Sequence, residues 1–567
     1  MDYKAEIARV LSEIARVLSE FLPYEEAYSL LVPPKDIALG DICMPCFRLA
    51  KAWRKSPVAI AEELAGKIQK PPFVEEIKAV AGYLNFRYSS SNFASEVIGK
   101  VLEKGADYGR SDKGQGQAVC IDYSSINIAK PFHIGHLSTT VLGAALYRLY
   151  RALGYNAVGI NHLGDWGTQF GKLIVAYHKW SNREDIERGG VRRLVEIYVK
   201  FHQEAELHPE LDDEARDWFR RLEEGDSEAY ALWQWFKEIT LKDDLPIYER
   251  LGVHFDSFAG ESFYNDKMQA VIDELEEKNL LVDSEGARIV ELEGMAPCII
   301  VKRDGATLYA TRDLAAAFYR KQHYDFVKCL YVVAYQQNLH FKQWFSVVDR
   351  MGYDWAKQLE HVAFGMVSLE EGAMSTRKGN AVWLVDVLDK AVEKALAIIH
   401  EKSPHLANAT DVAEMVGVGS VIFSALINNR IKDIEFKYDK ILNFDGETCP
   451  YVQYTHARCL SVLGKAGEVD LSGADYSSLS DDVSKDIVRS LERYPALLLE
   501  AADKNEPSFI TRHVVELAKL YNKFYFDNKI LSAPDGVREA RLALTRAVAT
   551  VIENGFAIIG IRLPDQM

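Results

Sequence analysis

One short stretch of the chain concentrates residue types that bind phosphate groups. It reads Asp122-Tyr-Ser-Ser-Ile-Asn-Ile-Ala-Lys-Pro-Phe-His-Ile-Gly-His136. It joins a predicted strand to a predicted helix, whose N-terminus attracts anions, and Gly135 lets a ligand approach the backbone closely. His133 and His136 are three residues apart and face the same side of the helix start. Their N–H groups could therefore stabilise the charge that develops on a phosphoryl group in transfer.

Two other interpretations of this histidine pair stay open: a metal site and unrelated structural histidines. A metal site is disfavoured because metalloproteases use H-E-x-x-H, and no glutamate lies between these two histidines. The placement between strand and helix disfavours the structural interpretation. Cys43 and Cys46 form half of a zinc pattern, but the chain has no second CxxC pair, so we predict buried thiols there and no metal site in the protein.

A second stretch, Met374-Ser-Thr-Arg-Lys-Gly-Asn380, follows a strand-like segment and a Glu-Glu-Gly turn. It is basic and contains glycine, which suits a loop that closes over a triphosphate. The alternative is an ordinary solvated basic loop. Its combination with the first stretch favours the phosphate-binding interpretation.

These motifs need a scaffold, and the pattern of residues around them predicts an α/β sheet. A strand at 118–124, a helix from about 135 to 153 and a strand at 156–165 form a βαβ unit, which begins a doubly wound parallel sheet. Ligands bind such sheets at the carboxyl ends of the strands. Other segments are predicted as a charged helical insertion at 181–260, strands at 287–301, 307–310 and 328–334, and helices from about 385 onward.

The N-terminal part has a different pattern. An amphipathic helix is predicted from the two copies of EIARVLS at 6–19, which place their apolar residues on one face. Helical patterning covers 43–69, a strand is predicted at 82–88, and Gly105 to Gln117 is predicted as a linker.

Composition limits the class of protein. The chain has 567 residues, of which 48% are hydrophobic and 26% charged, typical of three or four globular domains. Its N-terminus lacks the features of a secretory or transit signal, and seven cysteines argue against a disulfide framework. The net charge of −16 excludes a generally basic nucleic-acid coat, but residues 1–115 are neutral overall. We therefore expect a cytoplasmic protein that does not enter a membrane.

The motif S-S-x-N-I-A-K-P-x-H-I-G-H resembles the signature of arginyl-tRNA synthetases, which are class I aminoacyl-tRNA synthetases. His133-Ile-Gly-His136 resembles the HIGH motif of class I, and the Met374 stretch resembles its second motif, KMSKS. Further family-like segments are Leu163-Gly-Asp-Trp-Gly-Thr-Gln169, Tyr309-Ala-Thr-Arg-Asp313, Tyr451-Val-Gln-Tyr-Thr-His-Ala-Arg458 and Gly40-Asp-Ile-Cys-Met-Pro-Cys-Phe-Arg-Leu-Ala-Lys51.

This resemblance implies a fold and a division into domains. The fold would be an α/β Rossmann-type doubly wound parallel-sheet catalytic domain with an α+β N-terminal domain and an all-helical C-terminal anticodon-binding domain. The implied domains are 1–115 for binding the tRNA elbow, 116–384 for catalysis with the insertion at 181–260, 385–440 as a helical connection that contacts the tRNA stem, and 441–567 for the anticodon.

The resemblance also implies the reaction and its phosphate-binding residues. Arginine would attack ATP to give arginyl-adenylate and pyrophosphate, and the 3′-terminal ribose of tRNA(Arg) would then take the arginyl group. Mg²⁺ is expected to accompany ATP. The implied ATP-binding residues are His133, Gly135, His136, Met374 and Ser375, and the implied catalytic residues are His133, His136, Lys130, Arg377 and Lys378.

Two departures from the family pattern affect this prediction. Ile126 stands where the family usually has proline, and Ala373 stands where KMSKS begins with lysine. We predict that Lys130 or the basic loop supplies the missing positive charge.

An arginine substrate needs a carboxylate partner for its guanidinium. The resemblance implies Asp313 and Tyr309 for the side chain, Ser125 and Asn127 for the α-amino end, and Gln337, His136 and Asp122 elsewhere in the pocket. Gln336 is an alternative to Gln337. Asp313 could instead form a structural ion pair with Arg312 or Arg303.

Candidate tRNA contacts lie at both ends of the chain. Tyr451, Tyr454 and Arg458 offer stacking faces and a cation, although such a set also suits a core with a solvated face. Tyr83 and Asn85 alternate on the predicted strand, and the resemblance implies that they meet the tRNA elbow. We expect a monomer. The competing functions are another nucleotidyl transferase and a non-catalytic RNA-binding protein.

Overall fold

The structure is a computed structural model that describes the chain except residues 1–2, 19, 37–38, 304–308 and 370–381. It divides into two compact units. One contains Met1–Tyr108, Arg458–Arg493 and Leu517–Val551, and the other contains Gly109–Ala457, Tyr494–Glu516 and Ile552–Met567.

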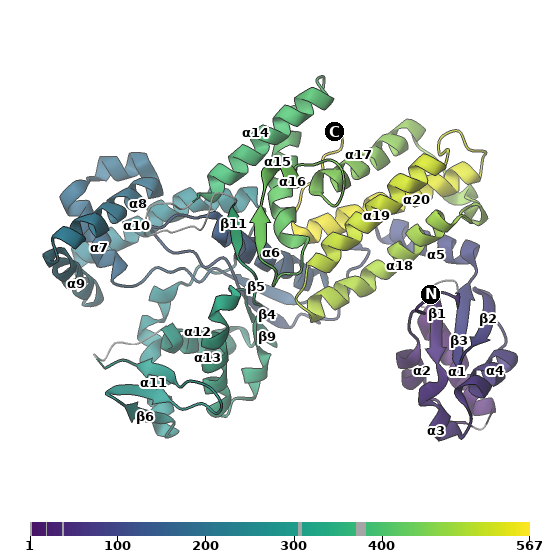
Figure 1. Ribbon diagram of the computed structural model, residues 1–567, viewed down its shortest axis with the longest axis horizontal. Coiled ribbons are helices and arrows are strands. Elements are labelled where there is room, and N and C mark those ends of the chain that lie inside the picture. The colour runs from purple at the N-terminus through teal and green to yellow at the C-terminus, as the bar shows by residue number, and fades with distance from the viewer. Residues whose placement is uncertain (1–2, 19, 37–38, 304–308, 370–381) are drawn as a thin grey trace. The chain divides into compact units, whose positions relative to one another are not determined.

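The larger unit is built on a parallel sheet with the strand order β10-β9-β4-β5 (Figure 1). Its strands are β4 (Ala118–Asp122), β5 (Asn156–Ile160), β9 (Lys328–Tyr331) and β10 (Leu359–His361). Helix α6 (Leu137–Ala152) joins β4 to β5, so the predicted βαβ unit is confirmed. In the sheet, β5 lies beside one edge of β4, and β9 lies beside the other edge, followed by β10. In open α/β sheets, ligands bind at such a reversal of strand order, which here lies at the carboxyl ends of β4 and β9.

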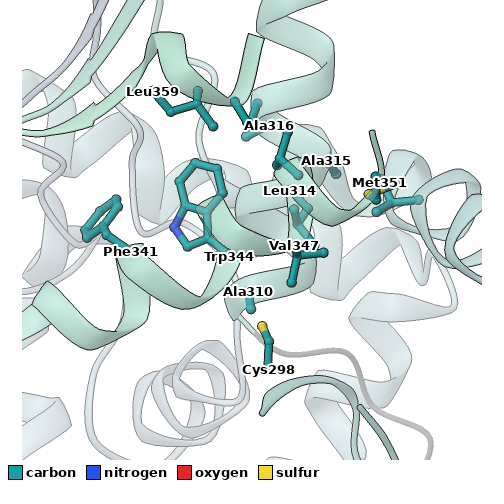
Figure 2. Packing of buried hydrophobic residues seen from close by; sticks show 14 of the residues in the cluster. Cys298, Ala310, Leu314, Ala315, Ala316, Phe341, Trp344, Val347, Met351 and Leu359 are labelled. Atoms are coloured by element: carbon teal, nitrogen blue, oxygen red, sulfur yellow. The ribbon is translucent and has the colours of Figure 1, made fainter. Parts of the chain in front are cut away.

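A buried cluster around Trp344 fixes two helices against this sheet (Figure 2). The helices are α12 (Tyr309–Tyr324) and α13 (Asn338–Arg350). The Trp344 indole is fully buried, and its ring centroid lies 5.1 Å from that of Tyr331 in β9. Ala315 and Ala316 of α12 are small enough to let the helices pack closely in this cluster. The packing holds α12 at a fixed position relative to the strands.

Most of the region 181–260 is helical, as its pattern predicts. The helices of this region are α7 (Gln169–Trp180), α8 (Arg183–Leu207), α9 (Glu210–Glu223) and α10 (Ser227–Arg250). Helix α8 is kinked at Gly190, whose φ of 58° is left-handed. The backbone N–H of Val191 next to the kink donates to Asp243 Oδ2 of α10 at 2.7 Å.

The expected strand at 307–310 is wrong for its described residues, because Tyr309 and Ala310 begin helix α12. The expected strand region 287–301 is instead two strands of an antiparallel sheet. Other elements of this unit are α11 (Met268–Glu277), β6 (Leu281–Ser284), β7 (Ala287–Val290), β8 (Cys298–Val301), β11 (Val367–Leu369), α14 (Leu384–Lys402), α15 (Ala409–Leu426), β12 (Ile434–Phe436) and α16 (Tyr438–Ile441).

The smaller unit contains an antiparallel sheet with the order β1-β3-β2. The predicted strand at 82–88 and the amphipathic N-terminal helix are confirmed, but the expected helix at 43–69 begins with strand β1. Cys43 and Cys46 are buried thiols, as predicted. The elements are α1 (Tyr3–Val17), α2 (Tyr24–Leu30), β1 (Ile42–Pro45), α3 (Ala50–Trp53), α4 (Pro57–Lys67), β2 (Val74–Val80), β3 (Tyr83–Tyr88) and α5 (Ser90–Lys104).

The C-terminal part is helical, as expected from its periodicity. Its long helices are α17 (Cys449–Ala466), α18 (Asp482–Asp503), α19 (Ser508–Asp527) and α20 (Val537–Ile559). Within the described residues, α15 and α20 are long and apolar enough to cross a membrane, and most of each is buried inside the protein.

Candidate active site

The two histidines of the first motif are held in one defined chemical state. His133 precedes the short 3₁₀ turn Ile134–His136 as its N-cap, and His136 ends the turn where it leads into α6. The Gly135 N–H donates to Nδ1 of His133 at 3.0 Å, and the His133 N–H donates to Nδ1 of His136 at 3.2 Å. Because each Nδ1 accepts a hydrogen bond, each ring carries its proton on Nε2. The rings stack with their centroids 3.9 Å apart, so the pair offers two N–H donors side by side.

Burial keeps both imidazoles neutral. It lowers the pKa of His133, and it lowers the pKa of His136 well below the usual value, with the nearby charges of His133 and Lys130 acting in the same direction. The histidines therefore act as hydrogen-bond donors near pH 7 and not as cations. Positive charge in this part of the site comes from Lys130.

The loop that precedes the histidines is strained and tightly braced. Ser124, Ser125 and Ala129 have left-handed φ values of 70°, 47° and 57°. The Ser124 hydroxyl lies 2.7 Å from the Tyr248 hydroxyl, and the Ala129 N–H donates to Oγ1 of Thr240 at 3.1 Å. Both partners are on α10, so the insertion helps to hold the loop in a conformation that costs free energy.

The motif at 163–169 supports the same loop. The Ile128 N–H donates to the Gly164 carbonyl at 3.1 Å, and a Cβ on Gly164 would come within 2.3 Å of Asn127 Oδ1. Glycine is therefore required for this close approach. The fully buried Asp165 accepts from Lys237 Nζ at 2.6 Å and joins the loop to α10.

Helix α12 presents the predicted guanidinium partners. Tyr309 and Asp313 are one turn apart, and Tyr309 is 67% exposed. Asp313 Oδ2 lies 2.5 Å from Nε2 of His340 on α13. The alternative ion pairs of Asp313 are not found among the described residues, since Arg312 lies near Glu261 and Arg303 contacts Glu285. Asp313 remains accessible to a substrate.

Glu261 is a candidate site residue that the sequence pattern did not indicate. Its side chain is 15% exposed and lies 3.5 Å from Arg312 Nη1. Burial raises its pKa to about 7. The nearby cations Arg312 and Lys130 oppose this rise, and the carboxylates of Asp313 and Asp165 add to it. Through Arg312, Glu261 lies next to the start of α12, the helix that also carries Asp313. The segment 255–264 is aromatic and contains two carboxylates, Asp256 and Glu261, and its pattern does not single out Glu261.

Asp122 and Gln337 differ in their surroundings. Asp122 is buried at the end of β4, where Oδ1 accepts from the Ser125 hydroxyl at 2.7 Å and Oδ2 pairs with Arg320 Nη2 at 2.8 Å. In this structure it braces Ser125. Gln337 and Gln336 are both exposed in the turn after β9, so their exposure does not distinguish between them.

Met374, Ser375, Arg377 and Lys378 lie outside the described residues, but the ends of this segment are well placed. Before it, β11 pairs in parallel with β12. After it, the Val382 carbonyl accepts from the Ile134 N–H at 3.1 Å, and the Leu384 N–H donates to the Phe132 carbonyl at 2.9 Å. The chain that follows this segment is therefore bonded directly to the histidine motif.

The candidate tRNA contacts have different degrees of exposure. In the smaller unit, Tyr83 is half-buried, whereas Asn85 is 1% exposed and its amide donates to the Lys78 and Tyr83 carbonyls. Asn85 thus supports the strand pair. Arg458 bonds to Asn522 and lies over the Tyr525 ring at 5.0 Å.

The remaining two candidates belong to the larger unit. Tyr454 of α17 is 43% exposed, and Tyr451 is half-buried. Tyr454 therefore presents more of its ring for stacking on a base.

Three family profiles match successive parts of the sequence. The profile described as tRNA synthetases class I (R), catalytic domain, matches residues 97–438. The profile described as DALR anticodon binding domain matches 452–567, and that described as Arginyl tRNA synthetase N terminal domain matches 1–88.

Individual relatives agree with these profiles over their full length. The arginine–tRNA ligases of Alkaliphilus metalliredigens and Clostridioides difficile are 50% and 52% identical, with complete coverage of both chains. The arginyl-tRNA synthetase structure from Thermus thermophilus has a TM-score of 0.82 at 25% identity and full coverage of both chains. The Plasmodium falciparum structure has a TM-score of 0.80 at 20% identity, covering 100% of this chain and 99% of that one, and shows the shared fold. Together with the catalytic profile over more than half of the sequence, these matches show that the chain belongs to the class I arginyl-tRNA synthetases.

Proposed function

We propose that the crevice at the carboxyl ends of β4 and β9 activates arginine with ATP and passes it to tRNA. The reaction is the two-step ligation of the family: the arginine carboxylate attacks the α-phosphate of ATP and releases pyrophosphate, and the 3′-terminal ribose hydroxyl of tRNA then takes the arginyl group. The observation that carries the assignment is the backbone bonding of the segment 163–164. The Leu163 carbonyl accepts from the Glu261 N–H at 2.9 Å, and the Gly164 N–H donates at 2.9 Å to the Ile126 carbonyl in the loop before the histidines. Phosphate donors and an acidic pocket therefore share one site.

The phosphates would be bound at the start of α6. In this proposal, the Nε2–H groups of His133 and His136 donate to phosphate oxygens, and Gly135 leaves room for their approach. Lys130 adds positive charge from the preceding loop. These groups hardly reorganise during the reaction, because the backbone fixes both rings.

The basic segment would complete the phosphate site. Met374 and Ser375 are assigned to ATP, and Arg377 and Lys378 to charge neutralisation. The hydrogen bonds of Val382 and Leu384 to the histidine segment support this assignment, since they anchor one end of the basic segment beside the site.

The arginine side chain would enter the acidic pocket. Asp313 and Glu261 supply carboxylates for the guanidinium, and Tyr309 supplies an exposed ring and hydroxyl at the entrance. The backbone-braced Ser125 and Asn127 would hold the α-amino end, and Gln337 is assigned to the same substrate. With its guanidinium in the acidic pocket and its carboxylate near the histidines, the substrate arginine would be oriented for attack on the α-phosphate of ATP.

Mg²⁺ would enter this site with ATP. Among the described residues, no group of three or more His, Cys, Asp or Glu side chains is placed to hold a metal ion. A cation coordinated mainly by triphosphate oxygens and water does not need such a group of side chains. The bound ion would supply charge neutralisation at the phosphates.

Binding of tRNA would extend to the N- and C-terminal regions. Tyr454 and Tyr451 would stack on bases and Arg458 would contact the backbone, while Tyr83 and the strand stabilised by Asn85 would meet the tRNA elbow. We further propose a monomer that works in the cytoplasm and does not enter a membrane, in line with the burial of α15 and α20.

Aminoacylation of total tRNA with each amino acid in turn tests the proposed function. We expect charging with arginine alone, and ATP–pyrophosphate exchange that also depends on arginine. Charging with another amino acid would contradict the acidic-pocket assignment. Adenylate transfer to a small cofactor without any charging of tRNA would favour another nucleotidyl transferase.

A further inference from the structure

Arg320 is a buried cation in the larger unit to which the proposed mechanism gives no role. It lies on α12, is 1% exposed, and pairs through Nη2 with Asp122 Oδ2 at 2.8 Å. Tyr331 of β9 flanks it, with the guanidinium carbon 5.4 Å from the ring centroid. Buried ion pairs are weak sources of stability, because apolar side chains of similar volume often replace them without loss. The pair therefore calls for an explanation in the chemistry of the site.

The pair connects the two ends of the substrate pocket. Arg320 and Asp313 are seven residues apart on α12 and so project from nearly the same side of the helix, about 10 Å apart along its axis. Beyond Arg320, Asp122 accepts the hydroxyl hydrogen of Ser125 at 2.7 Å. A continuous path thus runs from the helix that carries Asp313 to the loop assigned to the α-amino group.

The direction of these hydrogen bonds fixes what Ser125 offers to a ligand. Since an ionised Asp122 only accepts hydrogen bonds, the Ser125 hydroxyl donates to it and turns its lone pairs outward. Those lone pairs can accept from an α-ammonium group. Ser125 has a left-handed φ of 47°, so the hydroxyl direction depends on this brace.

Arg320 has a second effect, on charge. Arginine carries two cationic groups, and an unpaired carboxylate at Asp122 would compete with Asp313 for the guanidinium. The close pairing with Arg320 neutralises Asp122. It leaves the Ser125 hydroxyl as an acceptor for the ammonium group without offering a second strong guanidinium site.

We propose that Arg320 is a positioning residue that acts through Asp122 to aim the Ser125 hydroxyl at the α-amino group of arginine and to prevent reversed binding of the substrate. The inference rests on the proposed placement of Ser125. It makes the recognition of the α-amino group depend on the same helix that recognises the guanidinium.

The test compares arginine with 5-guanidinopentanoic acid, which lacks only the α-amino group. In aminoacylation assays of the full chain, we expect Arg320→Met to raise KM for arginine at least tenfold and to leave KM for ATP unchanged. The inhibition constant of the deaminated analogue should change less than twofold, because that ligand cannot use Ser125. Arg320→Lys, which keeps the charge, should restore part of the arginine affinity. Lys321→Met removes a charge from the next position of α12 and should leave both constants unchanged.

A double variant separates positioning from folding. Arg320→Met with Asp122→Leu replaces the pair by apolar side chains and should recover the thermal stability lost in the single variants. We expect KM for arginine to stay high in this variant. Recovery of wild-type KM would overturn the proposal, as would an equal loss of affinity for arginine and the analogue in Arg320→Met.

Ser125→Ala distinguishes failure of this inference from failure of the assignment beneath it. If Ser125→Ala leaves the preference for arginine over the analogue unchanged, the placement of Ser125 is wrong. If Ser125→Ala reduces that preference and Arg320→Met does not, the placement holds and the role of Arg320 is wrong.

Discussion

Replacement of Asp313 by asparagine should remove most of the discrimination in favour of arginine. The change keeps the shape of the side chain and a neutral hydrogen-bonding group, but it leaves the substrate guanidinium without this carboxylate. Two unit charges about 4 Å apart at an effective dielectric constant of about 20 attract by roughly 4 kcal/mol. The Asp313 side chain is 26% exposed, so solvent screening reduces this figure. We expect a loss of about 2–4 kcal/mol in kcat/KM, or roughly 30-fold to 1,000-fold.

The assay is arginylation of tRNA over a range of arginine concentrations, with KM for ATP measured in parallel. We expect the loss to fall on the arginine kinetics and KM for ATP to stay within twofold. Asp325→Asn is the matched control, because Asp325 follows the end of α12 with its side chain 90% exposed. Arginylation by Asp313→Asn at a near-wild-type rate and KM would remove Asp313 from the pocket and refute the reasoning.

Three further predictions concern the remaining parts of the site. Exchange of ATP and pyrophosphate should appear only with tRNA present, since tRNA binding is expected to shift the population toward the active state; robust exchange by the protein alone would contradict this. Lys130→Ala should lower kcat of activation about a hundredfold with little change in arginine binding. If Lys130→Ala has no effect and Lys378→Ala causes this loss, the positive charge comes from the basic loop. Glu261 has a folded-state pKa of about 7, above its ordinary value, so the native state binds the extra proton and stability falls as pH rises toward 7. Glu261→Gln should therefore increase the free energy of unfolding at pH 8 by up to ~3 kcal/mol, with no gain at pH 4. Denaturant unfolding at both pH values checks this change in stability. The same variant should weaken arginine binding.

Local patterns predicted the centre of the fold well. The strand at Ala118–Asp122, the helix Leu137–Ala152 and the strand Asn156–Ile160 follow one another closely, and each has a clear periodicity or apolar run. His133 and His136 are joined by bonds within four residues. Their geometry is therefore set by nearby sequence.

Features that depend on tertiary contacts were missed. Ile42–Pro45 forms a strand because β3 pairs with it from about 40 residues away, which local patterning does not register. Tyr309 and Ala310 suggested a strand by composition, although Asp313 lies one helical turn beyond Tyr309. Glu261 and Arg320 have ion-pair partners on distant segments, and no spacing in the sequence connects either pair.

The position of β4 in the sheet has a consequence for how the chain acquires its structure. One neighbour, β5, follows after a single helix, whereas the other neighbour, β9, is made about 200 residues later. During synthesis, β4 and β5 can pair early, but the other edge of β4 stays open until β9 has left the ribosome. Closure of that edge is a non-local step and is therefore expected to be slow. Asp122 meets Arg320 only after α12 has been made, so the nascent chain contains the histidine turn before the proposed amino-acid pocket is complete.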